Sequence, residues 1–222
     1  MTATRDKDIR EPLFDFLEEH YGKIRIIEEK NIGSSRADVV MVTQHSLYGI
    51  EIKSDADTYT RLSGQVKDYD RFFDRNIVVA GSSHGLSIET HVPEYWGIIT
   101  VEQTSEGYDF YVLREALDNP GIKLDKKLSL LWRPEISQLQ QMNEMPKYEA
   151  LSKKNVIDRI CMRVPDKIAR DVIDDQICEL LFERDYEKIS QIVNEYRKAH
   201  GNNAKKRPRV KRRRKRGRTA KE

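Results

Sequence analysis

The chain has 222 residues, of which 40 are Lys or Arg and 37 are Asp or Glu, and charged residues make up 35% of it. Its length leaves room for one domain of about 150 residues with appendages. The sequence has no apolar run of transmembrane length and no apolar segment of a secretion signal, and Cys161 and Cys178 lack the spacing of a metal site. We therefore expect a cytoplasmic protein with reduced cysteines that does not attach to membranes.

The first predicted elements are a helix and a strand. Apolar residues recur at helical spacing in residues 5–20, and we expect Pro12 in the first turn of this helix or at a kink in it. Residues 24–27 form a short β-type run, which predicts the first strand.

Two further β-type runs, residues 36–42 and 47–53, flank a short connection and predict a hairpin. With the turn centred between the runs, Asp38 lies almost directly opposite Glu51, and Lys53 shares the strand face of Glu51. Two acids and a lysine on one strand face outline a metal-dependent phosphodiesterase site. The same pattern also fits a solvated strand face on which charged and apolar residues alternate, and these residues alone leave both interpretations open.

A helix is predicted after the hairpin. Leu62, Val66, Tyr69 and Phe73 mark one apolar face of this helix, and Gln65 lies on the same face. A core-facing amide needs hydrogen-bond partners, so we expect Gln65 and Tyr69 to reach back over the proposed site. The alternative is a half-exposed glutamine beside an ordinary core tyrosine. A short apolar run that follows the helix, residues 77–81, predicts a buried strand.

The order strand, strand, helix, strand, together with three motifs, resembles the PD-(D/E)XK nuclease superfamily. The motifs are Ala37-Asp38, Glu51-Ile52-Lys53 and Gln65-Val66-Lys67-Asp68-Tyr69, the last of which matches the Gln-x-x-x-Tyr motif of the RecB-like branch. Residues 49–58 and 130–133 are similar to a family of small bacterial and phage proteins placed in that superfamily. The resemblance covers most of residues 8–160, and it departs from the superfamily pattern at Ala37, where the superfamily name has proline.

The resemblance implies an α/β fold with a restriction-endonuclease-like mixed β-sheet core flanked by helices. It also implies a divalent-metal-dependent nuclease, in our interpretation a DNA endonuclease, in the cytoplasm of a bacterium or of a phage-infected cell. Asp38 and Glu51, together with the backbone carbonyl of Ile52, would bind Mg²⁺ or Mn²⁺. Lys53 would orient the attacking water or stabilise the charge that builds on the phosphate.

The resemblance also assigns supporting roles. Gln65 and Tyr69 would hold Lys53, the nucleophile or the substrate phosphate in place. A further carboxylate ligand is common in the superfamily, and helical phase leaves it open among Glu11, Glu18, Glu19 and Glu29.

The second half of the chain changes character. Residues 96–101 and 108–113 predict a second β pair, which completes a mixed sheet of five or six strands in a nuclease core of residues 1–116. Residues 117–200 are predicted to be helical, with a further amphipathic helix over 168–181.

Within this helical region, two short helices near residues 134–142 and 152–160 resemble a SAP-like nucleic-acid-binding hairpin, with Lys153 and Lys154 in the first turn of the second helix. A plain helical subdomain that packs on the sheet fits the same residues.

Residues 201–222 are predicted to be a disordered basic tail. Residues 205–222 hold 12 of the 40 basic residues and one of the 37 acidic residues, so the preceding 204 residues carry 28 bases and 36 acids, a net charge of −8. The expected partner of such a tail is DNA, with RNA left open. The bases proposed to bind nucleic acid are Arg207, Arg209, Lys211, Arg212, Arg213, Arg214, Lys215 and Arg216.

Two other functions remain open from the sequence. One is a nucleic-acid-binding protein that keeps the fold without catalysis, and the other is a nuclease subunit that a partner protein directs to its target. The chain would act with a protein partner, as a homodimer or alone.

Overall fold

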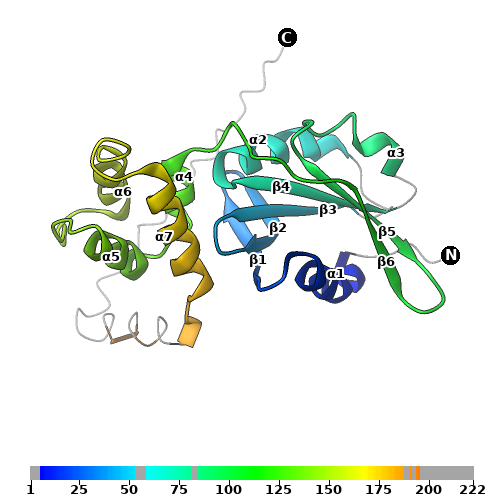
Figure 1. Cartoon of the computed structure of the whole chain (residues 1–222), viewed down its shortest axis with the longest axis horizontal. Helices are drawn as coiled ribbons and strands as arrows, with labels where there is room; N and C mark the ends of the chain where they lie inside the picture. The colour runs from blue at the N-terminus through cyan, green and yellow to red at the C-terminus, as the bar shows by residue number, and fades with distance from the viewer. Residues whose placement is uncertain (1–5, 54–58, 82–84, 188–190, 192–193, 196–222) are drawn as a thin grey trace, which may run out of the picture. The chain divides into compact units, whose positions relative to one another are not determined.

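A computed structural model describes residues 6–53, 59–81, 85–187, 191 and 194–195 (Figure 1). Residues 1–184 form one compact unit, and everything described below lies within it. The eight tail bases predicted to bind nucleic acid lie outside the described residues. No helix in the described part of the chain combines the length and the apolarity needed to cross a bilayer.

The protein is an α/β protein built on one six-stranded mixed sheet, as the sequence predicted (Figure 1). The strands lie side by side in chain order: β1 (Arg25–Ile32), β2 (Ser35–Val42), β3 (Leu47–Lys53), β4 (Arg75–Gly81), β5 (Gly97–Gln103) and β6 (Tyr108–Arg114). The pairs of β3 with β4 and of β4 with β5 are parallel, and the other three pairs are antiparallel. Residues 77–81 of the central strand β4 are the predicted apolar run, and they are buried because both faces of this strand are covered.

Helices flank the sheet and form a group beside it. They are α1 (Asp6–Tyr21), the 3₁₀ turn η1 (Tyr59–Arg61), α2 (Leu62–Phe72), α3 (Gly85–Ile88), α4 (Leu124–Ser129), α5 (Arg133–Met142), α6 (Lys153–Cys161) and α7 (Arg170–Phe182). The predicted helices over residues 5–20, 134–142, 152–160 and 168–181 are confirmed within one or two residues at most ends. Ser152 caps α6, because its hydroxyl accepts a hydrogen bond from the backbone of Asn155.

Two details differ from the sequence prediction. Pro12 lies in the interior of α1 and not in its first turn, because the helix already begins at Asp6; the alternative of a kink at Pro12 stays a prediction. Strand β1 continues to Ile32, five residues beyond the predicted end, because β1 is an edge strand on which the charged residues Glu28 and Glu29 remain exposed.

Each sheet face packs against a different set of helices. Ile9, Leu13 and Leu17 of α1 pack on one face, against alternate side chains of β2 to β5. The opposite face packs against α2 (Figure 1). There, Gly49 of β3 leaves room for two aromatic rings. A Cβ atom at Gly49 would lie 2.7 Å from ring atoms of both Tyr69 and Phe73, so only glycine fits there.

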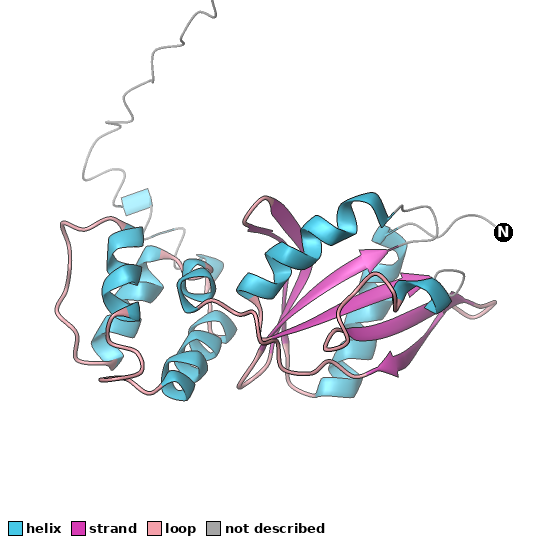
Figure 2. Cartoon of the chain, turned by 90° about the horizontal axis from the view of Figure 1, so that it is seen from above, coloured by secondary structure: helices cyan, strands magenta, loops and turns pink. Residues whose placement is uncertain are grey.

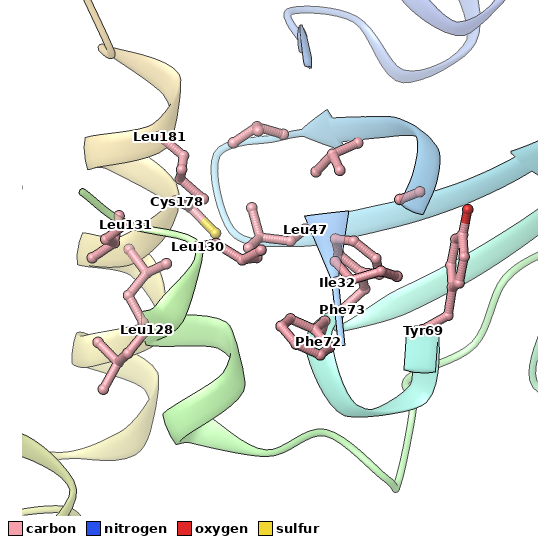
Figure 3. Close-up of a cluster of buried hydrophobic side chains, with 14 of the residues drawn as sticks. Ile32, Leu47, Tyr69, Phe72, Phe73, Leu128, Leu130, Leu131, Cys178 and Leu181 are labelled. Atoms are coloured by element: carbon pink, nitrogen blue, oxygen red, sulfur yellow. The ribbon is translucent and has the colours of Figure 1, made fainter. Parts of the chain in front are cut away.

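The core on the α2 side continues into the group formed by α4 to α7, which lies beside the sheet (Figure 2). Leu47 of β3 lies between Phe72 and Phe73 on one side and Leu130 and Cys178 on the other (Figure 3). The helices predicted beyond residue 117 therefore share a hydrophobic core with the sheet.

A buried ammonium group reinforces this junction. Lys127 of α4 is fully buried and donates hydrogen bonds to Asp74 at 2.8 Å and to Asp174 at 2.9 Å. Asp74 in turn accepts a hydrogen bond from the backbone N–H of Leu47, at the start of β3. These bonds connect α4 and α7 to the strand that carries the proposed catalytic residues.

Candidate active site

The hairpin of β2 and β3 has the predicted register. Val39 pairs with Ile50, which places Asp38 and Glu51 at the next position along the two strands. The ladder between β2 and β3 ends there, although β2 continues to pair with β1. The two strands therefore separate beyond Val39, at the point where the proposed metal ligands lie.

The hydroxyl of Tyr69 occupies the point of separation. It accepts a hydrogen bond from the backbone N–H of Asp38 at 3.2 Å and lies 3.3 Å from the carbonyl oxygen of Ile50, so it joins the two strands where direct pairing stops. Its proton is directed at Oε2 of Glu51, only 2.6 Å away. Burial and the charge of Glu51 raise the pKa of Tyr69 well above its usual value, which keeps the phenol protonated as a donor.

Glu51 is the centre of a buried hydrogen-bond network. Its Oε1 accepts from Nζ of Lys53 at 2.7 Å and from the amide of Gln65, while Oε2 accepts from Tyr69. Nζ of Lys53 also donates to Oε1 of Gln65 at 3.1 Å. The expectation that a core-facing Gln65 requires partners is confirmed. These donors occupy three of the roughly four acceptor positions of the Glu51 carboxylate.

Asp38 lies on the other side of the strand separation. Its Oδ2 accepts the backbone N–H of Ile52 at 2.9 Å, so the carboxylate takes the place of a backbone partner in the interrupted ladder. Its Oδ1 lies 4.0 Å from Nη2 of Arg10, a buried residue of α1. The sequence analysis did not select Arg10. Its spacing could have pointed to it, because Arg10 lies three residues before Leu13 and seven before Leu17, on the apolar stripe of the helix.

The four candidates for the further metal ligand lie in different surroundings. Glu29 is the one of the four predicted candidates whose contacts bring it near Asp38, since both carboxylates lie 4.0 Å from Arg10. Glu11, Glu18 and Glu19 lie on the exposed side of α1. Within the residues that the structure describes, no three His, Cys, Asp or Glu side chains come together as a metal-binding group.

A cavity of about 640 Å³ lies beside Asp38 and Glu51. Its wall includes Asp38, Glu51, Lys53 and Gln65, together with two arginines that sequence reasoning did not select, Arg36 and Arg61. Both arginines are exposed. The cavity therefore has carboxylates and an ammonium on its inner wall and additional positive charge among its lining residues.

Asp68 fixes the β1–β2 turn on one side of this cavity. Its Oδ2 accepts the backbone N–H of Ser34 at 3.0 Å and the hydroxyls of Ser34 and Ser35 at 2.7 Å each, and its Oδ1 pairs with Arg71. Burial opposes ionisation of Asp68, but these hydrogen bonds outweigh it and lower the pKa of the carboxyl below its usual value. The sequence analysis assigned no role to Asp68, which occupies a variable position of the Gln-x-x-x-Tyr motif.

Residues 1–208 match the family model described as Bacteriophage P4 protein cII. The chain belongs to this family. No curated protein and no solved structure matches the chain. The P4 cII match spans the cavity, the helical group and the first bases of the tail, so all three belong to one family unit.

The two lysines predicted to bind nucleic acid differ in this P4 cII family protein. Lys154 is exposed on the first turn of α6. Lys153 is half-buried, and its Nζ donates to the carbonyl oxygen of Ser129 at 2.7 Å. Burial lowers the pKa of Lys153 below its usual value.

Proposed function

We propose that this member of the P4 cII family is a divalent-metal-dependent nuclease with a restriction-endonuclease-like core that hydrolyses DNA phosphodiester bonds. One observation carries the proposal. Asp38 of β2, Glu51 and Lys53 of β3, and Gln65 of α2 line one cavity, although they come from three separate segments. A charged strand face exposed to solvent would not bury Glu51 and Lys53 beneath a helix, so that alternative is disfavoured.

The donor set of the cavity suits a hard cation. Mg²⁺ in proteins is commonly held by one or two carboxylates together with water molecules and substrate phosphates. Asp38 and Glu51 would supply the carboxylates, and the carbonyl of Ile52 a further oxygen. When bound, the metal would lower the pKa of a water molecule and polarise the phosphoryl oxygen.

The chain's own residues provide the remaining functions. Lys53 uses two of its three N–H donors for Glu51 and Gln65 in the described part of the chain, which leaves one for a phosphate oxygen. An ammonium held in this way stabilises the negative charge that builds on the phosphate during attack. Tyr69, a permanent donor, orients Glu51, and Arg36 would attract the substrate backbone. The tail of residues 205–222 would hold the nucleic acid, with DNA preferred and RNA open.

A second function is favoured by a different observation. The ion pair of Glu51 and Lys53, at 2.7 Å and buried, is complete without any ligand. A nucleic-acid-binding protein that keeps this pair for stability and lacks catalysis would show the same contacts.

A cleavage assay separates the two functions. The purified protein is incubated with supercoiled, linear and single-stranded DNA, in Mg²⁺, Mn²⁺ or EDTA. We expect metal-dependent cutting that Glu51→Gln abolishes and that Lys53→Gln slows by about 100-fold or more. Glu18→Gln, an exposed carboxylate on α1, is the matched control and should cut normally. DNA binding without cutting under every condition would reject the nuclease in favour of the binding protein.

A further inference from the structure

Two lysines from distant parts of the chain approach neighbouring carbonyl groups at the end of α4. Nζ of Lys30, on β1, lies 3.2 Å from the carbonyl oxygen of Leu130, and Nζ of Lys153, on α6, lies 2.7 Å from that of Ser129. Both lysines are half-buried. The sheet edge and the helical group thus place two ammonium groups at one location.

The nearest acid does not neutralise them. Glu135 is buried and forms a two-point ion pair with Arg184, at 2.6 and 2.7 Å. Arg184 also donates to the carbonyl of Leu130 and lies over the ring of Trp132, 4.6 Å from its centroid. Within the residues that the structure describes, neither Lys30 nor Lys153 forms an ion pair.

The location therefore carries an excess of positive charge. The carbonyl end of a helix is equivalent to about half a negative charge, which cannot balance two ammonium groups. Each ammonium uses one of its three donors on a carbonyl, so up to four donors remain. Burial, together with the charges of Arg184 and Lys153, lowers the pKa of Lys30 to about 8. An anion bound at this location would raise the pKa of Lys30, because its negative charge would offset the charges of Arg184 and Lys153.

We propose that Lys30 and Lys153 form a phosphate-binding site that holds a backbone phosphate of the nucleic-acid substrate at the end of α4. The two lysines offer several N–H donors and net positive charge to an oxyanion. The backbone of Lys30 pairs with that of Ala37, the residue before Asp38, so one lysine of the site comes from the strand next to the one that carries Asp38. Arg184 and Glu135 would position the site without binding the ligand. The proposal rests on the proposed function, because it takes a nucleic acid as the ligand.

Lysine acetylation tests the site directly, because only the uncharged amine reacts. At pH 8 a larger share of Lys30 than of an ordinary lysine is uncharged, because the pKa of Lys30 is lowered to about 8. The full chain in EDTA, which prevents cutting, is treated with acetic anhydride with and without saturating DNA or RNA, and each lysine is followed by mass spectrometry. Bound phosphate should slow the reaction of Lys30 about fivefold if it raises the pKa of Lys30 by about one unit.

The neighbouring Lys154 is the control, because it is exposed and outside the proposed site. We expect protection of Lys30 and Lys153 and little change at Lys154. The proposed site would be overturned by equal protection of all three lysines. It would also be overturned if neither Lys30 nor Lys153 is protected while a gel shift shows bound nucleic acid, or if no nucleic acid binds at all.

The outcome is separable from that of the cleavage assay. Protection of the two lysines in a protein that never cuts would keep this site and reject the nuclease, whereas cutting without protection would reject the site alone. As a second measurement, the Lys30→Gln/Lys153→Gln variant should reduce the slope of log affinity against log salt by about 0.9 for duplex DNA, because one phosphate contact is lost. Lys154→Gln should leave the slope unchanged.

Discussion

Removing the hydroxyl of Tyr69 tests the hydrogen-bond network that joins the separated strands. In Tyr69→Phe the ring still packs beside Phe73 and Trp96, but the backbone N–H of Asp38 loses its partner and Glu51 loses one of three donors. Tyr69 is fully buried, so water does not replace these bonds without rearrangement. The loss of the hydrogen bonds to the Glu51 carboxylate and to the buried N–H of Asp38 should together lower the free energy of unfolding by about 3 kcal/mol.

Urea denaturation measures this change. With a slope of about 2 kcal/mol per molar urea, the midpoint should fall by about 1.5 M while the slope itself stays constant. Amide hydrogen exchange adds a local readout, because the N–H of Asp38 should exchange faster in the variant than in the parent protein.

The control is Tyr95→Phe. Tyr95 also donates to a carboxylate, that of Asp70 at 2.8 Å, but it is half-exposed and lies outside the cavity. We expect a loss of about 1 kcal/mol there. A loss in Tyr69→Phe no larger than in Tyr95→Phe would refute the reasoning, because the tyrosine would then not be joining the strands.

Two further predictions concern residues that position the cavity. Gly49→Ala should destabilise the protein by about 3 kcal/mol, because the added methyl group would overlap Tyr69 and Phe73. Gly64→Ala should stabilise it by up to about 1 kcal/mol, because Gly64 is helical and has open space around it. Thermal unfolding measures both variants, and similar changes in melting temperature would contradict the prediction. Asp68→Asn should lower the free energy of unfolding at pH 7, because folding lowers the pKa of Asp68 and the ionised carboxylate therefore stabilises the folded state. This stabilisation is fully present above the usual pKa of 3.8, and it disappears as the pH falls through the pKa of the folded state. Urea titrations should therefore show a difference in unfolding free energy between the variant and the parent protein that narrows in acid. A difference that is independent of pH would argue against an ionised Asp68. The control is Asp125→Asn, because Asp125 is a half-exposed carboxylate on α4.

The parts of the site that follow local periodicity could be predicted from the sequence. Strand alternation and the hairpin spacing give the register that aligns Asp38 with Glu51, and helical spacing puts Gln65 on the face of Tyr69. The cost of burying an amide without partners then points Gln65 toward a polar site. These inferences need only neighbouring residues and the rules of one element at a time.

The parts that depend on long-range packing could not be predicted. Arg10 reaches Asp38 from a helix on the opposite face of the sheet, and Lys30 meets a carbonyl 100 residues away. In a chain that is 35% charged, a functional lysine or arginine has the same appearance as a solvated one. The choice between them is made by which segments come together, and the pattern of a single element does not contain that information.

The strand separation connects the fold to the proposed chemistry. A continuous β2–β3 ladder would direct the backbone N–H of Ile52 at strand β2, but here Oδ2 of Asp38 accepts it, and the hydroxyl of Tyr69 joins Asp38 to Glu51. The residues proposed to bind the metal are thus the ones that complete the interrupted ladder, which fixes their positions before any ligand arrives. Preorganised carboxylates of this kind favour catalysis, because no reorganisation is needed when charge develops. Tyr69→Phe should therefore weaken metal-dependent cutting as well as stability, whereas a purely structural network would lose stability alone.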